Sequence, residues 1–482
     1  MATFYVCKSG CNTNDGSLKN PFLEISHAAA LVNPGDTVIV MPGVYNETVH
    51  LTRPGKFGAT INFRAHPDYM AKDLLQKHKN FDAATSAGVV VTGISNPASV
   101  EAEGNGFNIT ASYQRVEGFF VTAPQVNTGI PVKIRRPNES EPPHSNIEII
   151  DNVVYNGSEA GINSENAYNL TVKGNIVFHN ASTGVYEGSG ISVGFNHIPY
   201  KGDNANRWQI IVDSNICYNN AGYDIGRRKS LRNVTGENLP HGNNPDPALR
   251  QLGSTDGNGI IIDWAHETPT LVRNNIVYNN GGRGICLTSS SNVAVVNNTS
   301  YDNAWDPYQF YHLADYDDYT ASLERGGNGN IFVNNIVYTK NDGVVGVRAK
   351  IEESFQGYNL YFNGRITENS LHESDIVQDP LFVNPPLLIG EGCRPVIKKS
   401  SNRLAGFDWA NAYPLEVYHY FDVDFALQAD SKAIGSGYVK DADDIPVELR
   451  HRLDDALPEY DVYGKLRNPG SMDMGAVAFT AG

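Results

Sequence analysis

Side chains that can carry chemistry gather in the middle of the chain, beside short apolar runs that each follow a glycine. Carboxylate, imidazole, amine and phenol groups transfer protons in general acid–base catalysis. The candidates for this task are Tyr186, His197, Lys229, Asp263 and His266. Arginine and lysine pair with carboxylates, and an exposed aromatic ring can stack on a sugar. The candidates for substrate binding are Glu165, Arg227, Arg228, Trp264, Arg283, Arg348 and Lys350. These residue types favour an acidic polysaccharide as the partner.

Two reactions fit this set. β-Elimination on a uronate polymer needs a base for the C5 proton, an acid for the leaving oxygen and a positive group that stabilises the developing enolate. Arg228 or Arg348 could supply the positive charge, and so could Ca²⁺ held by Asp263 and Glu165. Hydrolysis instead needs two carboxylates, for which Asp256 and Asp263 are the obvious pair.

The runs that follow a glycine align on one apolar position. The anchors are Ile162, Ile191, Ile260, Ile285 and Val345. Because side chains alternate between the two faces of a strand, the third residue beyond each anchor points outward. These third residues are Glu165, Gly194, Asp263, Thr288 and Arg348. His197 and His266 each stand six residues beyond an anchor. The alignment predicts one surface patch that brings the candidates together.

The elements that must position this patch are repeats. The phrase apolar-x-x-Asn-apolar-x-aromatic-Asn recurs from about Asn146 to Asn363, and its marker asparagines are Asn152, Asn175, Asn215, Asn275, Asn298, Asn335 and Asn359. They are separated by 23, 40, 60, 23, 37 and 24 residues. A base period of 23–24 with short β-branched runs predicts two or three strands per turn. We therefore expect an all-β, right-handed parallel β-helix solenoid whose asparagines hydrogen-bond along the stack. A β-propeller needs a longer period, and the leucine-rich pattern is missing.

Capping and insertions complete the predicted architecture. A short amphipathic helix at Phe22–Val32 would cover the open N-terminal end. The three long steps predict loop insertions near residues 196–207, 226–258 and 304–328 that form the walls of a groove. Tyrosines around the third insertion, from Tyr301 to Tyr319, could line it. We expect one domain over residues 1–482, with a cap and first rungs at 1–60, rungs at 61–375 and an irregular C-terminal closure at 376–482.

Composition excludes some partners. A net charge of −16 argues against nucleic acid, which needs a basic face. No apolar run is long enough to span a membrane. Cys7 and Cys11 are spaced for a small-loop disulfide, whereas Cys217 and Cys286 lie in strand runs and are expected to be packed thiols.

On these rungs, the chain from about Phe4 to Asn363 resembles the pectate-lyase-like superfamily of parallel β-helices. The opening DGSLKNPFLEISHAAALVNPGDTVIVMPGVYNETV is similar to that of polysaccharide lyase families 9 and 31, and DFALQADSKAIGSG with DMGAVAF resembles their closing motif. The resemblance implies a secreted or periplasmic enzyme that cleaves pectate, alginate or a related acidic polysaccharide. The first residues, MATFYVCKSG, contain no signal-peptide core. We expect a monomer, with a trimer as the alternative.

The sequence also departs from relatives of this superfamily. It lacks the aspartate cluster and following lysine of family 9 pectate lyases, the DPH motif of mannuronan epimerases, and the paired-aspartate and His-Gly motifs of polygalacturonases. The expected function is therefore a lyase with alginate as first substrate and pectate as second, either without a cofactor or with Ca²⁺. The alternatives are a glycoside hydrolase, a non-catalytic carbohydrate-binding or adhesion solenoid, and an epimerase.

Overall fold

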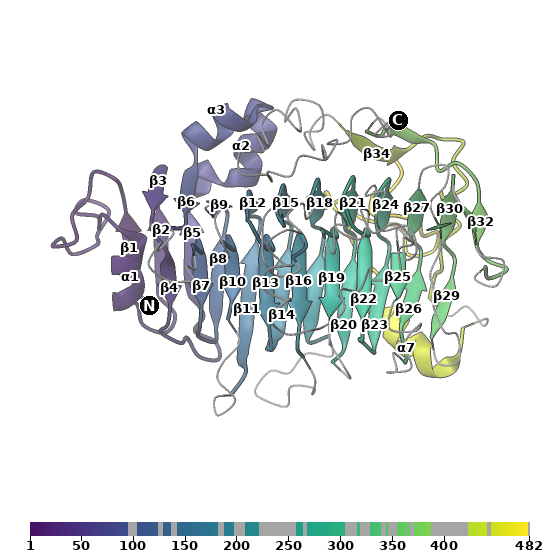
Figure 1. The fold of residues 1–482 in the computed structure, drawn as a ribbon, viewed down its shortest axis with the longest axis horizontal. Helices are drawn as coiled ribbons and strands as arrows, with labels where there is room; N and C mark the ends of the chain where they lie inside the picture. The colour runs from purple at the N-terminus through teal and green to yellow at the C-terminus, as the bar shows by residue number, and fades with distance from the viewer. Residues whose placement is uncertain are drawn as a thin grey trace, which may run out of the picture.

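Three long parallel sheets run side by side along one axis (Figure 1). The computed structural model of the chain describes residues 1–94, 104–123, 129–135, 142–181, 188–196, 208–220, 257–263, 268–303, 316–318, 328–338, 344–345, 354–363, 365–366, 371–386, 423–440 and 445–480. From residue 37 to residue 318, each turn of the chain contributes one strand to each sheet in the order A, B, C, as in β11 (His144–Ile150), β12 (Val153–Tyr155) and β13 (Ile162–Glu165). The predicted right-handed parallel β-helix is confirmed.

The strands of each sheet are short and pair in parallel. Sheet A comprises β1 (Thr3–Val6), β2 (Thr37–Val40), β5 (Ile61–Ala65), β8 (Gln114–Glu117), β11 (His144–Ile150), β14 (Ala167–Lys173), β17 (Ile210–Asp213), β20 (Thr270–Arg273), β23 (Val293–Val296), β26 (Ile331–Val333) and β29 (Phe355–Gly357). Sheet B comprises β3 (Gly43–Asn46), β6 (Val89–Thr92), β9 (Phe120–Thr122), β12 (Val153–Tyr155), β15 (Ile176–Phe178), β18 (Ile216–Tyr218), β21 (Ile276–Tyr278), β24 (Thr299–Tyr301), β27 (Ile336–Tyr338), β30 (Leu360–Phe362) and β32 (Ile376–Val377). Sheet C comprises β4 (Val49–Leu51), β7 (Phe107–Ile109), β10 (Val132–Ile134), β13 (Ile162–Glu165), β16 (Ile191–Gly194), β19 (Ile260–Asp263), β22 (Ile285–Thr288) and β25 (Tyr316–Asp318).

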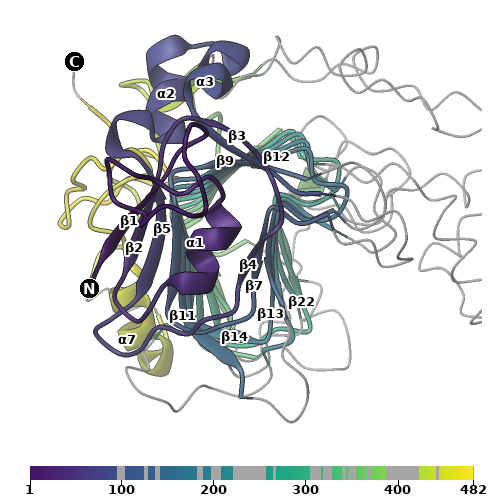
Figure 2. The same cartoon turned by 90° about the vertical axis from the view of Figure 1, so that its left-hand side faces the viewer.

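Two small sheets and a few helices complete the described elements. The small sheets pair β28 (Val344–Val345) with β31 (Arg365–Ile366) and β33 (Phe382–Asn384) with β34 (Asp424–Leu427). The helices are α1 (Ile25–Leu31), the 3-10 turn η1 (Pro67–Tyr69), α2 (Ala71–His78), α3 (Phe81–Ala87) and α7 (Val447–Ala456). Helix α1 lies across the N-terminal opening, as predicted, and buries Ile25 and Ala28 in the solenoid core (Figure 2). No described helix is long and apolar enough to cross a membrane.

The marker asparagines form the predicted ladder at the corner between sheets A and B. Their side chains are almost fully buried, and the Nδ2 group of each donates to the Oδ1 atom of the next, as from Asn215 to Asn275 at 3.0 Å. The residue before each marker has positive φ, as Asn274 does, which turns the chain sharply into sheet B. Asparagine tolerates this conformation better than most residues. A second ladder, through Asn180, Asn220 and Asn280, holds the corner between sheets B and C.

The described segments that cover the solenoid from outside lie on sheets A and B (Figure 2). On sheet B, Tyr155, Phe178, Tyr218 and Tyr278 stack along the outside with ring centroids 4.9–5.7 Å apart. The ring of Phe81 from α3 packs edge-on against this row. On sheet A, α7 lies over an apolar patch that includes Leu271, Ala294 and Ile331. Sheets A and B are therefore engaged in packing for much of their length.

The C-terminal segment, residues 423–480, runs along the side of the solenoid and does not merely close its end. Asn274 donates to the carbonyl of Tyr460 at 2.8 Å, and Asn297 donates to that of Asp473 at 2.8 Å. Arg467 is buried there and donates to Asn274 Oδ1 at 3.1 Å. Burial lowers the pKa of this guanidinium to about 10, against the opposing effect of nearby carboxylates, first of all Asp461.

Some expectations need correction. Cys7 and Cys11 are free thiols that contact the hydroxyl groups of Ser9 and Thr13, so the predicted disulfide is wrong. Cys217 and Cys286 are buried thiols, as expected.

Tyr301 does not line a groove, because its ring is buried on the outside of sheet B and its hydroxyl donates to the Pro386 carbonyl at 2.9 Å. The predicted insertions lie mostly outside the described residues.

Candidate functional site

The outward face of sheet C, called the sheet C face below, carries a set of polar side chains in two parallel columns. Strand pairing defines both columns, because residues in register on neighbouring strands lie roughly 4.8 Å apart. The first column runs through His50, Asn108, Lys133, Asn163 and Ser192 and continues to Ile261 and Cys286. The second column runs through Glu165, Gly194, Asp263 and Thr288. Arg135 directly follows the Ile134–Ser164 pair, so it extends the second column beside Glu165.

The alignment made on the sequence is confirmed for four of its five members. Ile162, Ile191, Ile260 and Ile285 pair in register, as the glycine-anchored runs predicted. The fifth member is wrong, since Tyr316 of β25 and not Val345 pairs with Ile285. Val345 instead pairs with Ile366 in a separate two-stranded sheet. The third predicted insertion contains a further strand of sheet C, β25. The sequence alignment did not identify it because it lacks the glycine that precedes the other strands.

Two carboxylates project from alternate rungs of this face. Glu165 and Asp263 lie two strands apart, which places their Cα atoms roughly 10 Å from each other. Gly194 stands between them, and a Cβ atom there would come within 2.9 Å of the Asp263 carbonyl oxygen. The missing side chain allows the backbone of the neighbouring strand to approach closely at this position. Both carboxylates are partly exposed at the carboxyl ends of their strands.

The sequence search missed two cations of the face. Lys133 is half-buried and lies in register with Asn163, whereas Arg135 is exposed and lies beside Glu165. They were missed because β10 lies before the regular repeat, where no marker asparagine indicates the register. The sequence feature that could have identified them is the alternation in VKIR. It places Lys133 and Arg135 on one side of the strand and Val132 and Ile134 on the other. One face thus carries two cations at β10 and two carboxylates at β13 and β19.

Three buried polar atoms on the first column have no hydrogen-bond partner among the described residues. They are Oδ1 of Asn108, Oδ1 of Asn163 and Oγ of Ser192, and the last two are on neighbouring strands. A buried polar atom without a partner costs roughly 1–3 kcal/mol, so such atoms are usually retained where a ligand or water completes them. The position of Asn163 and Ser192 beside Glu165 extends the candidate site along the solenoid axis.

Of the other predicted residues, Arg283 is the one that the structure describes. It lies two residues before β22 and, through its backbone N–H, donates to Asn258 Oδ1 at 2.8 Å. It stands at the opposite end of the strand from Thr288, the register partner of Asp263. Arg283 therefore lies away from the two carboxylates, and its role in substrate binding stays a prediction. The remaining candidates lie outside the described residues: Tyr186, His197, Arg227, Arg228, Lys229, Trp264, His266, Arg348 and Lys350, together with Asp256.

The described residues offer a calcium ion little coordination. They contain no group of three histidine, cysteine, aspartate or glutamate side chains arranged to hold a metal. Glu165 and Asp263 supply two carboxylates, whereas Ca²⁺ takes about 6–8 oxygen ligands. The described part of the sheet C face alone therefore does not fit a calcium site.

Comparison with known proteins places this geometry in context. The family model described as "Pel9A-like, right handed beta helix region" matches residues 4–328. The uncharacterized protein YwoF of Bacillus subtilis is 25% identical over 366 residues, which cover 70% of this chain and 68% of that protein. Pectate lyase L of Dickeya dadantii is 29% identical over 128 residues, 25% of this chain and 26% of that protein.

Among solved structures, pectate lyase Pel9A is similar at 16% identity with a TM-score of 0.49, covering 100% of this chain and 97% of that one. The alginate lyase from Paenibacillus sp. str. FPU-7 is similar at 12% identity with a TM-score of 0.43, covering 78% and 99%.

Proposed function

Because the chain belongs to the Pel9A-like right-handed β-helix family, we propose that it is a polysaccharide lyase that cleaves a uronate polymer along the sheet C face. The observation that carries this proposal is that one face carries the cations Lys133 and Arg135 at β10 and, on the following rungs, the carboxylates Glu165 and Asp263. Among the described residues, packing segments lie on the outer sides of sheets A and B, so the sheet C face is the better candidate for a long ligand (Figure 2).

The chemistry assigns a task to each charge. In β-elimination, a base removes the proton at C5, the C4–O bond breaks, a C4–C5 double bond forms, and the leaving oxygen takes up a proton. Arg135 and Lys133 would pair with uronate carboxylates, and a cation at the reacting sugar stabilises the charge that develops on its carboxylate. Asp263 would bind at the reacting sugar and take part in proton transfer. The other proposed proton-transfer groups are Tyr186, His197, Lys229 and His266.

Pectate is the first substrate to test, and alginate is the second. The sequence alone placed alginate first because family 9 motifs are missing. The stretch shared with pectate lyase L, 29% identical over 128 residues, now favours the reverse order. Cleavage of such a polymer outside the cytoplasm, by a secreted or periplasmic protein, remains part of the proposal, and so does action as a monomer.

The test is a substrate panel of pectate, polymannuronate, polyguluronate and a neutral glycan, each with and without a chelator. Ultraviolet absorbance reports the unsaturated uronate, and a reducing-end assay runs in parallel. We expect absorbance to rise on one uronate polymer and to persist in chelator, because cationic side chains neutralise the carboxylate. Loss of activity in chelator, restored by Ca²⁺, would instead assign that task to a metal.

The separation of Glu165 and Asp263 supports a second candidate, an inverting glycoside hydrolase. Inverting enzymes hold their two carboxyl groups roughly 6.5–9.5 Å apart, which two side chains on alternate rungs can reach. The Asp256–Asp263 pair suggested by the sequence stays a prediction, because Asp256 lies outside the described residues. New reducing ends without ultraviolet absorbance would favour hydrolysis over elimination.

A further inference from the structure

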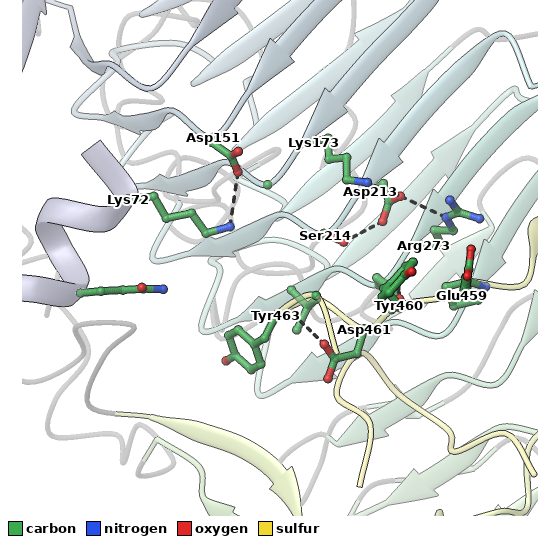
Figure 3. A pocket seen from close by; sticks show the side chains of 16 residues that line it. Lys72, Asp151, Lys173, Asp213, Ser214, Arg273, Glu459, Tyr460, Asp461 and Tyr463 are labelled. Atoms are coloured by element: carbon green, nitrogen blue, oxygen red, sulfur yellow. Dashed lines mark hydrogen bonds and ion pairs between the residues drawn. The ribbon is translucent and has the colours of Figure 1, made fainter. Parts of the chain in front are cut away.

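A pocket lies at the corner between sheets A and B (Figure 3), whereas the proposed substrate surface is on sheet C. Its volume is about 450 Å³, within the range typical of small-ligand sites. Three separate parts of the chain form its walls: helix α2, the corner turns of four successive rungs, and the C-terminal segment 458–464. Nothing in the proposed lyase reaction uses this corner pocket.

The charged side chains of the corner pocket are balanced. Lys72 Nζ lies 3.4 Å from Asp151 Oδ1, and Asp213 Oδ2 lies 3.1 Å from Arg273 Nε and 3.7 Å from Lys173 Nζ. Counting Glu459 and Asp461 as well, three cations face four carboxylates. This balance does not favour an anion. Interleaved donors and acceptors instead match the hydroxyl groups of a sugar, each of which both donates and accepts.

Two tyrosines give the corner pocket aromatic surface. Tyr460 and Tyr463 line it from the C-terminal segment, and each is 50% exposed (Figure 3). Half-exposed rings of this kind are apolar on their faces and polar at their hydroxyl tips, which suits stacking on a pyranose. Asp461 between them is held in place, because Oδ1 accepts the backbone N–H groups of Tyr463 and Lys465 at 2.9 and 2.8 Å. The platform is therefore built before any ligand arrives.

Gly174 keeps the floor of the corner pocket open. Its φ is +69°, and a Cβ atom there would lie 2.1 Å from Asp151 Oδ1 and 3.5 Å from Lys72 Nζ. Any side chain at this position would displace the Lys72–Asp151 pair from the pocket wall.

We propose that the corner pocket binds a neutral, hydroxyl-rich saccharide, independently of the sheet C face. The ligand would stack on Tyr460 or Tyr463 and hydrogen-bond to the Lys72–Asp151 pair and to Lys173. Such a site would hold the protein on a glycan while the sheet C face acts on another chain or region.

The test is native gel electrophoresis of the full chain in gels that contain arabinan, galactan, xylan or glucomannan, with pectate as the anionic comparison. We expect at least one neutral polysaccharide to retard the protein. The double variant Tyr460→Ala, Tyr463→Ala should bind it about tenfold more weakly, since both stacking surfaces are lost. Gly174→Ala should weaken binding by a different route. Leu466→Ala, an exposed apolar change in the same segment but outside the pocket, is the matched control.

Thermal unfolding checks that each variant is folded, and elimination activity on the uronate polymer should be unchanged in all of them. The proposal is overturned if no neutral polysaccharide retards the wild-type protein, or if the folded double variant is retarded as strongly as the wild type. Retardation by pectate alone that disappears in the double variant would also overturn it, because the pocket would then select an anion.

Discussion

Asp263 is the residue on which the proposed chemistry depends most. It lies near the middle of the sheet C face, beside Gly194, and on the same column as Glu165. A carboxylate in this position can hold a sugar hydroxyl or move a proton, whereas an amide of the same shape can only hydrogen-bond.

We therefore predict that Asp263→Asn lowers kcat by at least about 100-fold with little change in KM, because proton transfer contributes roughly 10²–10⁴ in rate. Initial rates of unsaturated product formation measure this. Asp430→Asn, the same change at an exposed site in the C-terminal segment, is the control and should behave as wild type. Wild-type kcat in a folded Asp263→Asn protein would remove Asp263 from the reaction.

At the scale of elements, the asparagine ladder holds successive rungs in register. The side chain of Asn275 makes four hydrogen bonds. Its Nδ2 group donates to Asn298 Oδ1 at 3.0 Å and to the Val212 carbonyl at 2.9 Å. Its Oδ1 atom accepts from the backbone N–H and from the Nδ2 group of Asn215. All of these atoms are buried, so each lost partner leaves a polar group without water to replace it.

Asn275→Leu keeps the volume of the side chain but removes its polar atoms. We expect it to lower the free energy of unfolding by about 2–4 kcal/mol, measured by urea denaturation. Replacing the exposed Asn468 by leucine should change it by less than about 0.5 kcal/mol. Equal effects at the two sites would show that the ladder does not stabilise the fold as described.

The ladder ends on a carboxylate, Asp375, whose Oδ1 accepts the backbone N–H of Asn359 at 2.8 Å. Burial raises the pKa of Asp375, although hydrogen bonds from the backbones of Asn359 and His372 oppose the shift. A raised pKa means that the folded state binds this proton more tightly than the unfolded state. The stabilising effect is therefore present below the unfolded pKa and lost as pH rises through the folded pKa.

Asp375→Asn removes this titration. The difference in unfolding free energy, wild type minus variant, should be larger at about pH 3 than at about pH 7. Urea denaturation of both proteins at the two pH values measures it, and a difference that grows with pH would contradict the assigned shift.

For the whole molecule, the sequence predicted most where the repeat is regular. Marker asparagines such as Asn215 and Asn275 indicated the ladder, and the glycine-anchored runs gave the register of β13, β16, β19 and β22. Where the repeat is absent, the sequence does not indicate the register of the strands. Lys133 and Arg135 precede the first marker, and β25 lacks its glycine. Helix α7 lies along the side of sheet A through long-range packing of Leu449 and Leu453, which no local pattern predicts.

At the scale of the whole molecule, we expect sheet C to be the face of the solenoid that binds substrate. Arg135 and Arg115 provide a matched comparison, because both point outward from strands of the same turn, Arg135 beyond β10 on sheet C and Arg115 on β8 on sheet A. Arg115 is held by Glu117 and Glu148 at 3.1 and 3.7 Å, an ion-pair cluster away from the proposed substrate.

The most direct measurement is therefore kcat/KM for elimination on the uronate polymer cleaved by the wild type, with Arg135→Met and Arg115→Met compared side by side. We predict a loss of about tenfold or more for Arg135→Met, since a charged pairing with the substrate is removed, and no loss for Arg115→Met. Equal rates for the two variants, a loss confined to Arg115→Met, or no unsaturated product from any polymer would contradict the account.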